Sequence, residues 1–199
     1  MEILLDSEIE DLDWKLHPNM VRIKTIADGS CFFHAIAKSY HKGYRDGEIG
    51  GKSINRSKMI RSMRSELAKK LGQKAPNSKK TYYQLLGKGE IEILSKENPE
   101  FSLDNLQKLL DSSRPVGNIF NEFVSNELKI DIYILDGKNK SVYRTSDDDK
   151  LLYKNRDSVV LLYIEDPGHY ELVGLRDGDK IHTIFNPSHD FIKNIKKNS

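Results

Sequence analysis

A nearly unbroken run of apolar, β-forming residues at positions 159–165 most constrains the fold that this chain can adopt. Such runs are typical of strands buried on both faces, because a strand with one solvated face alternates apolar and polar residues. The run therefore predicts a central strand in a sheet that is covered on both sides. Other strands are expected at 21–26, 131–136, 141–145, 169–175 and 180–185, the last two joined by the hairpin turn Asp177-Gly178.

Helical periodicity fills most of the chain between the first strand and the others. The expected helices cover residues 31–40, 53–71, 82–86, 91–95, 103–110 and 116–129. Residues 43–51 hold four glycines among charged residues and are expected to form a flexible loop, and 74–80 a linker. Because helices and strands are segregated along the chain, a doubly wound nucleotide-binding fold is disfavoured.

The length of 199 residues favours one domain with a proper core. We expect this domain at residues 21–185, preceded by a docking segment over 1–20 and followed by a terminal helix or tail over 186–199. The formal net charge is only +2, with acids and bases interspersed. This balance argues against a nucleic-acid partner.

The number of cysteines and the first residues of the chain indicate in which cellular compartment the protein is expected. The single cysteine excludes an internal disulfide and gives no sign of an oxidising environment. Residues 1–14 are acidic, the reverse of a signal peptide's basic start, and no apolar run approaches the length of a membrane span. We expect a monomer in the cytoplasm or nucleus, without a membrane partner; for a viral or bacterial chain, that cytoplasm would be the host's.

The only cysteine, Cys31, stands after the turn Asp28-Gly29-Ser30 and at the head of an apolar helical run. A helix N-terminus favours thiolate over thiol through its free N–H groups and its dipole, and thiolate is the nucleophilic form. Backbone N–H groups of residues 29–31 are also placed to stabilise an oxyanion. Free cysteine is nevertheless among the most buried residue types, so a catalytic and a structural Cys31 both stay open from these residues alone.

Two histidines are candidates for the general base of such a thiol. His169 follows the turn Pro167-Gly168 and begins a strand, a rim position from which it can reach across a cleft. On its own, a partly exposed strand-end histidine is the plainer interpretation. His34 shares a helical face with Cys31, but a base on the nucleophile's own helix would fill the space where substrate approaches. We therefore favour His169.

A third group must fix the tautomer of the base and stabilise its cation. Glu171 lies two residues after His169, so strand alternation puts both side chains on one face. An exposed strand glutamate without a catalytic role is the alternative. Asp28 is a second candidate, or else a residue that holds the turn by accepting hydrogen bonds from nearby backbone N–H groups.

Other chemistries lack the residues that they need. One cysteine and six scattered histidines offer no zinc-ligand spacing. No glycine-rich phosphate loop is followed by Lys-Ser/Thr, and residues 47–51 lack the preceding strand of a dinucleotide loop. No metal and no cofactor are expected.

Two motifs together resemble a known family. Residues 28–35, Asp-Gly-Ser-Cys-Phe-Phe-His-Ala, are similar to the Asp-Gly-x-Cys-Leu/Phe-Phe/Tyr-Arg/His-Ala signature of ovarian-tumour (OTU) cysteine proteases. Residues 168–171, Gly-His-Tyr-Glu, are similar to that family's Gly-His-Tyr-acid/Asn block, and the helix before the strand at 130–135 also fits. The resemblance covers roughly residues 20–176.

The resemblance implies a papain-like α/β (α+β-like) fold with a central, mostly antiparallel sheet between helical regions. It implies a thiol protease that hydrolyses isopeptide or peptide bonds at the C-terminal glycine of ubiquitin and, in some members, of ubiquitin-like modifiers. Cys31 would then be the nucleophile, His169 the general base, and Asp28 part of the loop that shapes the oxyanion hole. Glu171 stands where the family usually has aspartate or asparagine, so the orienting group is Glu171 or comes from elsewhere.

The implied partner is ubiquitin or a polyubiquitin chain, with the extended ubiquitin tail lying between the Cys31 helix and the His169 loop. Residues 147–149, three consecutive aspartates, are candidates to pair with arginines of that tail. The alternative function is a ubiquitin-binding module on the same fold, with weak or lost hydrolase activity.

Overall fold

The computed structural model describes residues 8–143, 151–166 and 168–198. The strands of its main sheet are β1 (Ile9–Asp11), β2 (Met20–Ile23), β5 (Asp131–Asp136), β6 (Ser141–Tyr143), β7 (Ser158–Ile164), β8 (His169–Asp177) and β9 (Lys180–His182). They are ordered β1-β2-β8-β7-β5-β6, and β9 also pairs with β8. β5 and β7 pair in parallel, while the other neighbouring pairs described are antiparallel.

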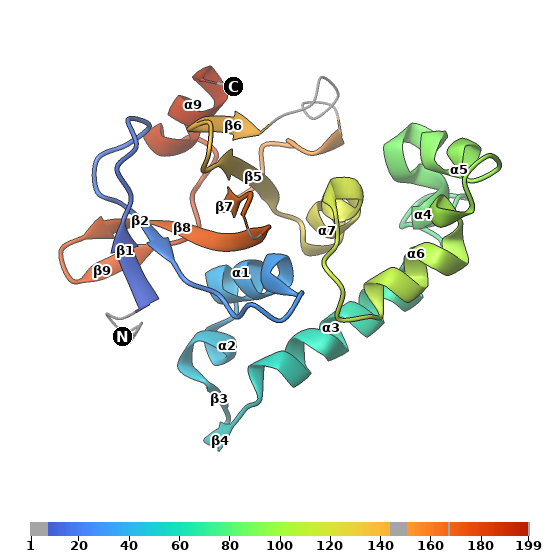
Figure 1. The fold of residues 1–199 in the computed structure, drawn as a ribbon, viewed down its shortest axis with the longest axis horizontal. Helices are drawn as coiled ribbons and strands as arrows, with labels where there is room; N and C mark the ends of the chain where they lie inside the picture. The colour runs from blue at the N-terminus through green and yellow to red at the C-terminus, as the bar shows by residue number, and fades with distance from the viewer. Residues whose placement is uncertain (1–7, 144–150, 167, 199) are drawn as a thin grey trace.

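The helices and a small separate hairpin surround this sheet (Figure 1). The helices are α1 (Cys31–Tyr40), α2 (Lys42–Asp46), α3 (Arg56–Leu71), α4 (Tyr82–Leu85), α5 (Glu90–Leu94), α6 (Leu103–Leu110), α7 (Asn121–Leu128) and α9 (Asp190–Lys197), with short 3-10 turns at η2 (Leu86–Gly89), η3 (Pro99–Phe101) and η4 (Asn118–Phe120). The hairpin consists of β3 (Glu48–Ile49) and β4 (Lys52–Ser53). α3 runs from this hairpin to the group formed by α4, α5 and α6. No helix of the described ranges is both long enough and apolar enough to cross a membrane.

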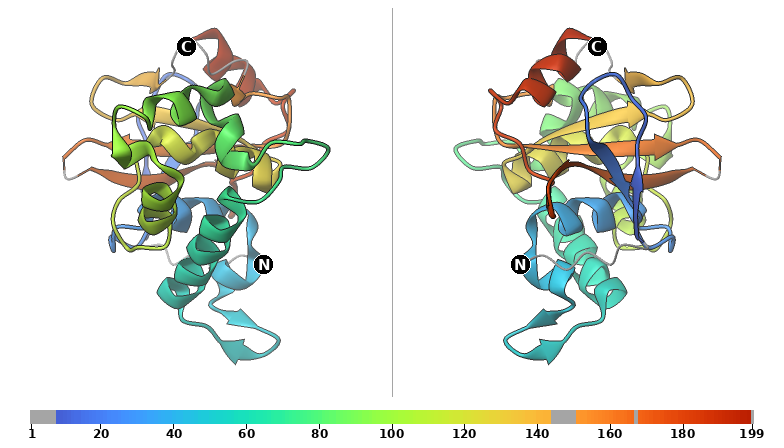
Figure 2. Two further views of the ribbon diagram at one scale, coloured as in Figure 1. Left: turned by 90° about the vertical axis from the view of Figure 1, so that its right-hand side faces the viewer. Right: turned by 90° about the vertical axis from the view of Figure 1, so that its left-hand side faces the viewer.

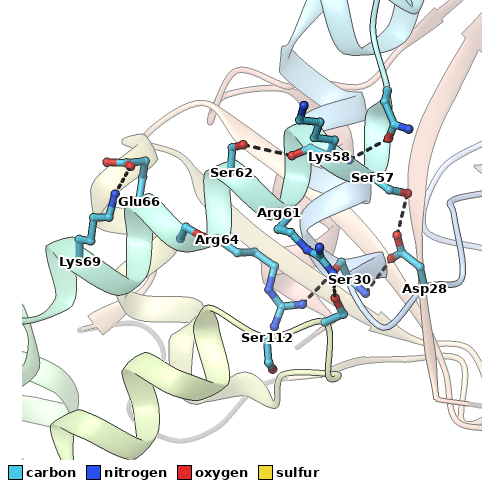
Figure 3. Close-up of a pocket in the computed structure, with 13 residues that line it drawn as sticks. Asp28, Ser30, Ser57, Lys58, Arg61, Ser62, Arg64, Glu66, Lys69 and Ser112 are labelled. Carbon is cyan, nitrogen blue, oxygen red and sulfur yellow. Dashed lines mark hydrogen bonds and ion pairs between the residues drawn. The ribbon is translucent and has the colours of Figure 1, made fainter.

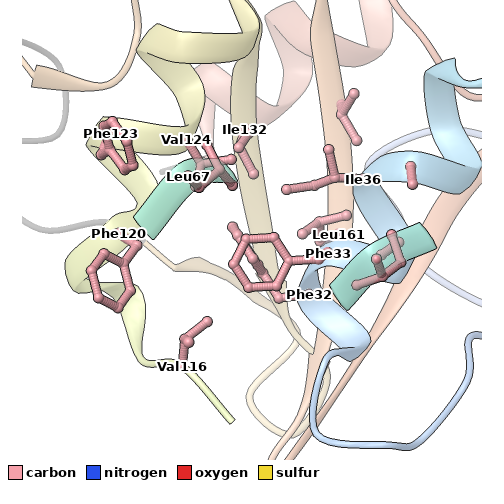
Figure 4. Close-up of a cluster of buried hydrophobic side chains, with 14 of the residues drawn as sticks. Phe32, Phe33, Ile36, Leu67, Val116, Phe120, Phe123, Val124, Ile132 and Leu161 are labelled. Carbon is pink, nitrogen blue, oxygen red and sulfur yellow. The ribbon is translucent and has the colours of Figure 1, made fainter. Parts of the chain in front are cut away.

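Side-chain alternation along the strands divides the core into two clusters, one on each face of the sheet. On one face, Leu161 and Leu172 belong to a cluster with Phe33 of α1 and with residues of α3 and α7 (Figure 4). On the other face, Val173 packs in a cluster with Phe191 of α9. Figure 2 shows α1 and α9 on opposite sides of the sheet. The predicted central strand is confirmed, because β7 lies between β5 and β8 and its first five residues are buried.

The prediction of a flexible loop over residues 43–51 is wrong. His41 caps α2 by accepting a hydrogen bond from the backbone N–H of Tyr44, whose ring is buried. Gly47 ends α2 in the left-handed conformation with φ 75°, and the β3–β4 hairpin follows. Gly47, Gly50 and Gly51 all have positive φ and therefore mark tight turns between short elements, because a residue without Cβ adopts positive φ readily.

The other elements follow the sequence pattern closely, with shifts at two helix starts. α3 begins at Arg56, because the side chain of Asn55 caps it by accepting from the backbone N–H of Lys58. The helix expected over 116–129 begins later, as η4 and then α7. Part of the expected strand 141–145 and the aspartates 147–149 lie outside the described residues.

Both ends of the described chain contact the sheet. β1 pairs with β2 at the sheet edge, and α9 supplies buried residues to the second core cluster. The domain boundaries at residues 20 and 185 stay a prediction.

Candidate active site

A short loop, residues 28–31, presents Cys31 as the first residue of α1. We call it the cysteine loop. Asp28 Oδ1 accepts a hydrogen bond from the backbone N–H of Ser30 at 3.0 Å, so Asp28 holds the turn as its second interpretation predicted. Gly29 has φ +79°, and a Cβ there would lie 2.0 Å from the carbonyl oxygen of Ser113. Only glycine therefore fits at this position.

A buried arginine of α3 ties the cysteine loop to the end of α6 (Figure 3). Arg64 Nη1 donates to Ser30 Oγ at 2.7 Å and to the carbonyl oxygen of Gly29 at 3.3 Å. Its other nitrogens donate to the carbonyl oxygens of Leu110, Leu109 and Arg114 at 2.9, 3.0 and 2.9 Å. The side chain is 1% exposed. Because a planar guanidinium offers five N–H donors in fixed directions, it can hold two loops in one relative position.

His34 binds Asp28 and does not stand free as a base. Its Nε2 lies 3.1 Å from both carboxylate oxygens of Asp28, and its Nδ1 lies 2.5 Å from the hydroxyl of Tyr44. Burial lowers the pKa of His34 despite the nearby carboxylate, so the neutral ring is favoured at neutral pH. Nε2 then donates to Asp28, and Nδ1 accepts from Tyr44.

The carboxylate of Asp28 is correspondingly stabilised. Burial alone would raise its pKa, but hydrogen bonds from His34 and from the Ser57 hydroxyl, with that of the Ser30 N–H, lower the pKa overall. Asp28 is therefore an ionised centre of the cysteine loop at neutral pH.

The thiol of Cys31 is less acidic than the sequence suggested. Burial raises the pKa of the thiol, and the nearby backbone N–H groups of Tyr170, Phe32 and Cys31 itself offset only part of this rise. The residue is 6% exposed. Desolvation of the thiolate is the largest cause of this shift, so the neutral thiol is favoured. The Ser30 N–H predicted to face an oxyanion instead donates to Asp28.

Tyr170 brings the two sequence motifs together, because it directly follows His169 and its backbone N–H lies near the Cys31 thiol. The ring of Tyr170 also packs edge-on against Phe32 of α1, with centroids 5.5 Å apart. His169 is the half-buried first residue of β8. Its Nε2 lies 3.2 Å from the hydroxyl of Thr25, just beyond β2.

Glu171 lies two residues along the same strand but its carboxylate has another neighbour. The side chain is buried, and Oε2 lies 3.6 Å from Nη1 of Arg22 on β2. Among the described residues, this oxygen has no hydrogen-bond partner. The structure therefore places Glu171 beside Arg22, and it places the hydroxyl of Thr25 in hydrogen-bond contact with the His169 ring instead.

A groove of about 880 Å³ runs beside the cysteine loop (Figure 3). Asp28 and Ser30 form one end of it, and the solvated side of α3 forms its length. It is lined by hydroxyl and charged side chains, among them Ser57, Lys58, Arg61, Ser62, Glu66, Lys69 and Ser112. The described residues contain no cluster of three or more His, Cys, Asp or Glu side chains arranged to hold a metal ion.

No protein-family model and no curated protein matches this sequence. Among solved structures, an ovarian-tumour (OTU) domain determined in complex with ubiquitin superposes with a TM-score of 0.57 at 17% identity, covering 98% of this chain and 91% of that one. The chain has the OTU fold.

Two further solved structures are similar over most of their length. An OTU deubiquitinase from Wolbachia pipientis wMel gives a TM-score of 0.48 at 15% identity, covering 92% of this chain and 98% of that one. The Hazara virus OTU bound to ubiquitin gives a TM-score of 0.44 at 16% identity, covering 85% of this chain and 89% of that one. The fold assignment rests on the first comparison, and it confirms the expected α/β class with its mostly antiparallel sheet.

Sequence reasoning missed two residues that this OTU fold brings to the site. Arg64 follows Ile60 by four positions and precedes Leu67 by three, so it stands within the apolar stripe of α3 and not opposite it. That position was the available signal for a buried arginine. Thr25 gave no such signal, because its contact with His169 depends on how β2 and β8 pair.

Proposed function

We propose that this chain is a deubiquitinating cysteine hydrolase that cleaves isopeptide or peptide bonds at the C-terminal glycine of ubiquitin, acting in the cytoplasm or nucleus. One observation carries the proposal: Tyr170, which follows His169, packs its ring edge-on against Phe32, which follows Cys31, with the ring centroids 5.5 Å apart. The OTU fold adds support, since the similar domain was solved in complex with ubiquitin. Ubiquitin-like modifiers are included in the proposed substrate class.

In the proposed reaction, His169 takes the thiol proton and the Cys31 thiolate attacks the carbonyl carbon of the terminal glycine. His169 then protonates the departing lysine amine, which leaves a thioester on Cys31. Water that is deprotonated by His169 hydrolyses this thioester and restores the thiol. A thiol whose pKa is raised by burial keeps its proton until a base removes it, so the mechanism needs a well-oriented imidazole.

Asp28 acts in this proposal by shaping the cysteine loop, where it fixes the Ser30 N–H and is itself held by His34 and Ser57. Two side chains are candidates to orient the His169 ring. Glu171 is the residue that the sequence motif favours, and Thr25 is the residue in contact with the ring.

A ubiquitin probe with an electrophilic C-terminus tests the proposal. We expect covalent labelling of the wild type and none of Cys31→Ala, because the variant retains the fold but lacks the nucleophile. Retained labelling or activity in Cys31→Ala would show that another residue is the nucleophile. Since Cys31 is the only cysteine, a thiol-directed label on the wild type has a single possible position.

A second candidate function is a ubiquitin-binding module with little or no hydrolase activity. The burial of Cys31 and the pairing of Glu171 with Arg22 favour it, because both weaken a thiol–imidazole–carboxylate triad. Incubation with di-ubiquitin separates the two candidates. Cleavage supports the hydrolase, and binding without cleavage supports the module.

A further inference from the structure

The hydroxyl of Thr25 makes two contacts, and together they settle the direction of both hydrogen bonds. Oγ1 lies 2.6 Å from the carbonyl oxygen of Tyr170 and 3.2 Å from Nε2 of His169. A carbonyl oxygen can only accept, so Thr25 must donate its one hydroxyl proton to Tyr170. Thr25 has no second proton to donate, and it therefore accepts from the ring.

This assignment fixes the tautomer of the neutral His169 ring. If Oγ1 accepts, Nε2 must carry the ring proton, and Nδ1 must carry the lone pair. The tautomer is thus assigned from the hydrogen-bond pattern. Tyr170 connects this pair to the cysteine helix, since its carbonyl accepts from Thr25 and its ring packs edge-on against Phe32, the residue after Cys31.

The carboxylate of Glu171, the other candidate to orient His169, pairs with an arginine. Register pairs Arg22 with Val173, so Glu171 is the diagonal neighbour of Arg22 on the same face of the β2–β8 pair, and its carboxylate lies 3.6 Å from Nη1 of Arg22. Glu171 is buried on the α9 face of the sheet, where it neutralises a cation. No hydrogen bond joins it to His169 among the described residues.

We propose that Thr25 is the positioning residue of His169, and that it replaces the carboxylate or amide of a conventional triad with a neutral hydroxyl. Thr25 holds Nε2–H, so that Nδ1 receives the proton when the S–H bond of Cys31 breaks and an N–H bond forms. The products of this step are a thiolate and an imidazolium. The catalytic part of the inference rests on the proposed function, whereas the tautomer is a property of the free protein.

The test uses the full chain with ¹⁵N-labelled histidine and reads the tautomer of His169 by two-bond ¹H–¹⁵N correlation spectra above the pH at which the ring titrates. In the wild type we expect the proton on Nε2. Thr25→Ser keeps the hydroxyl and should keep this tautomer. Thr25→Val removes the hydroxyl at nearly constant volume, and the ring should then become a mixture of both tautomers.

Glu171→Gln is the matched control, because it changes the other candidate without touching Thr25. We expect it to leave the tautomer unchanged. In di-ubiquitin cleavage, Thr25→Val should lower kcat roughly tenfold with little change in KM, in line with the loss of one orienting hydrogen bond. Thr25→Ser should restore most of the rate.

Two results would overturn the inference: a wild-type ring with its proton on Nδ1, or a tautomer that responds to Glu171→Gln but not to Thr25→Val. The first requires no variant, so it applies even if Thr25→Val fails to fold. If the wild type shows the Nε2–H tautomer and loses it in Thr25→Val but cleaves no ubiquitin, the positioning contact stands and the proposed function fails.

Discussion

The two halves of the candidate site are held in very different ways. The cysteine loop is fixed from several directions: Arg64 contacts Gly29 and Ser30, and Asp28 is bound by His34 and Ser57. At the histidine end, residues 168–171, the His169 ring contacts one hydroxyl among the described residues, that of Thr25, and the Glu171 carboxylate lies next to Arg22 on β2.

This difference indicates where each half is vulnerable. A loop held by many contacts keeps its shape when one exposed contact is lost, but it depends on any buried group that several contacts share. A ring with one hydrogen bond keeps the protein folded when that bond is lost, but its orientation changes. Substitutions should therefore alter stability at the cysteine loop and catalysis at the histidine end.

Arg64→Met should give the largest effect on stability. The buried guanidinium makes five hydrogen bonds to surrounding oxygens, and methionine removes all five donors while keeping the side chain buried. We expect the free energy of unfolding to fall by about 3–5 kcal/mol, since each buried acceptor that loses its donor costs about 1–3 kcal/mol. Urea unfolding followed by circular dichroism measures the change.

The matched variant Arg64→Lys retains the positive charge but not the planar fork, so it should recover only part of the loss. Equal stability of wild type and Arg64→Met would contradict the picture of a loop that is fixed by its buried contacts.

His34→Gln should change the free energy of unfolding by a smaller amount than Arg64→Met does, and this change should depend on pH. Burial lowers the pKa of His34 in the folded protein, whereas the ring takes up a proton near pH 6.5 in the unfolded chain. Its contribution to stability is complete above about pH 6.5 and declines as the pH falls from there toward the lower folded-state pKa. Glutamine can still donate to Asp28 and accept from Tyr44, but it does not titrate.

Unfolding curves of both proteins between about pH 5 and 8 isolate this contribution, because the other titrating groups are common to both. The wild type should lose stability relative to His34→Gln as the pH falls. A difference that does not change with pH would mean that the pKa of His34 is the same in the folded and the unfolded protein. If the wild type instead gained stability relative to His34→Gln as the pH falls, the folded ring would be charged, and the assigned hydrogen bonds around Asp28 would be wrong.

The sequence predicted elements well where one periodicity dominates. The strand at 131–136 and the helix that begins at Cys31 appear as expected, because apolar residues recur there at a single spacing. The prediction from the sequence was wrong at residues 43–51, where the glycines were taken to indicate a flexible loop. In the structure, capping by His41 and burial of Tyr44 order this segment.

At the site, the sequence identified residues but not the contacts between them. The motifs located Cys31 and His169, whose roles stay predictions. The partners of His169 and Glu171 depend on the pairing of β2 with β8, and alternation within one strand does not specify its neighbour. The thiol pKa was misjudged for a similar reason, because a helix N-terminus is visible in sequence while the depth of burial is not.

The central claim is that Cys31 and His169 work as one pair, and alkylation of the only thiol tests it most directly. A neutral electrophile reports the thiolate of Cys31 alone, since the chain has no other cysteine. At neutral pH the wild type should react measurably faster than His169→Gln, because the imidazole takes the proton that burial otherwise keeps on the sulfur. Equal rates in the two proteins across the pH range would show that the two side chains do not interact.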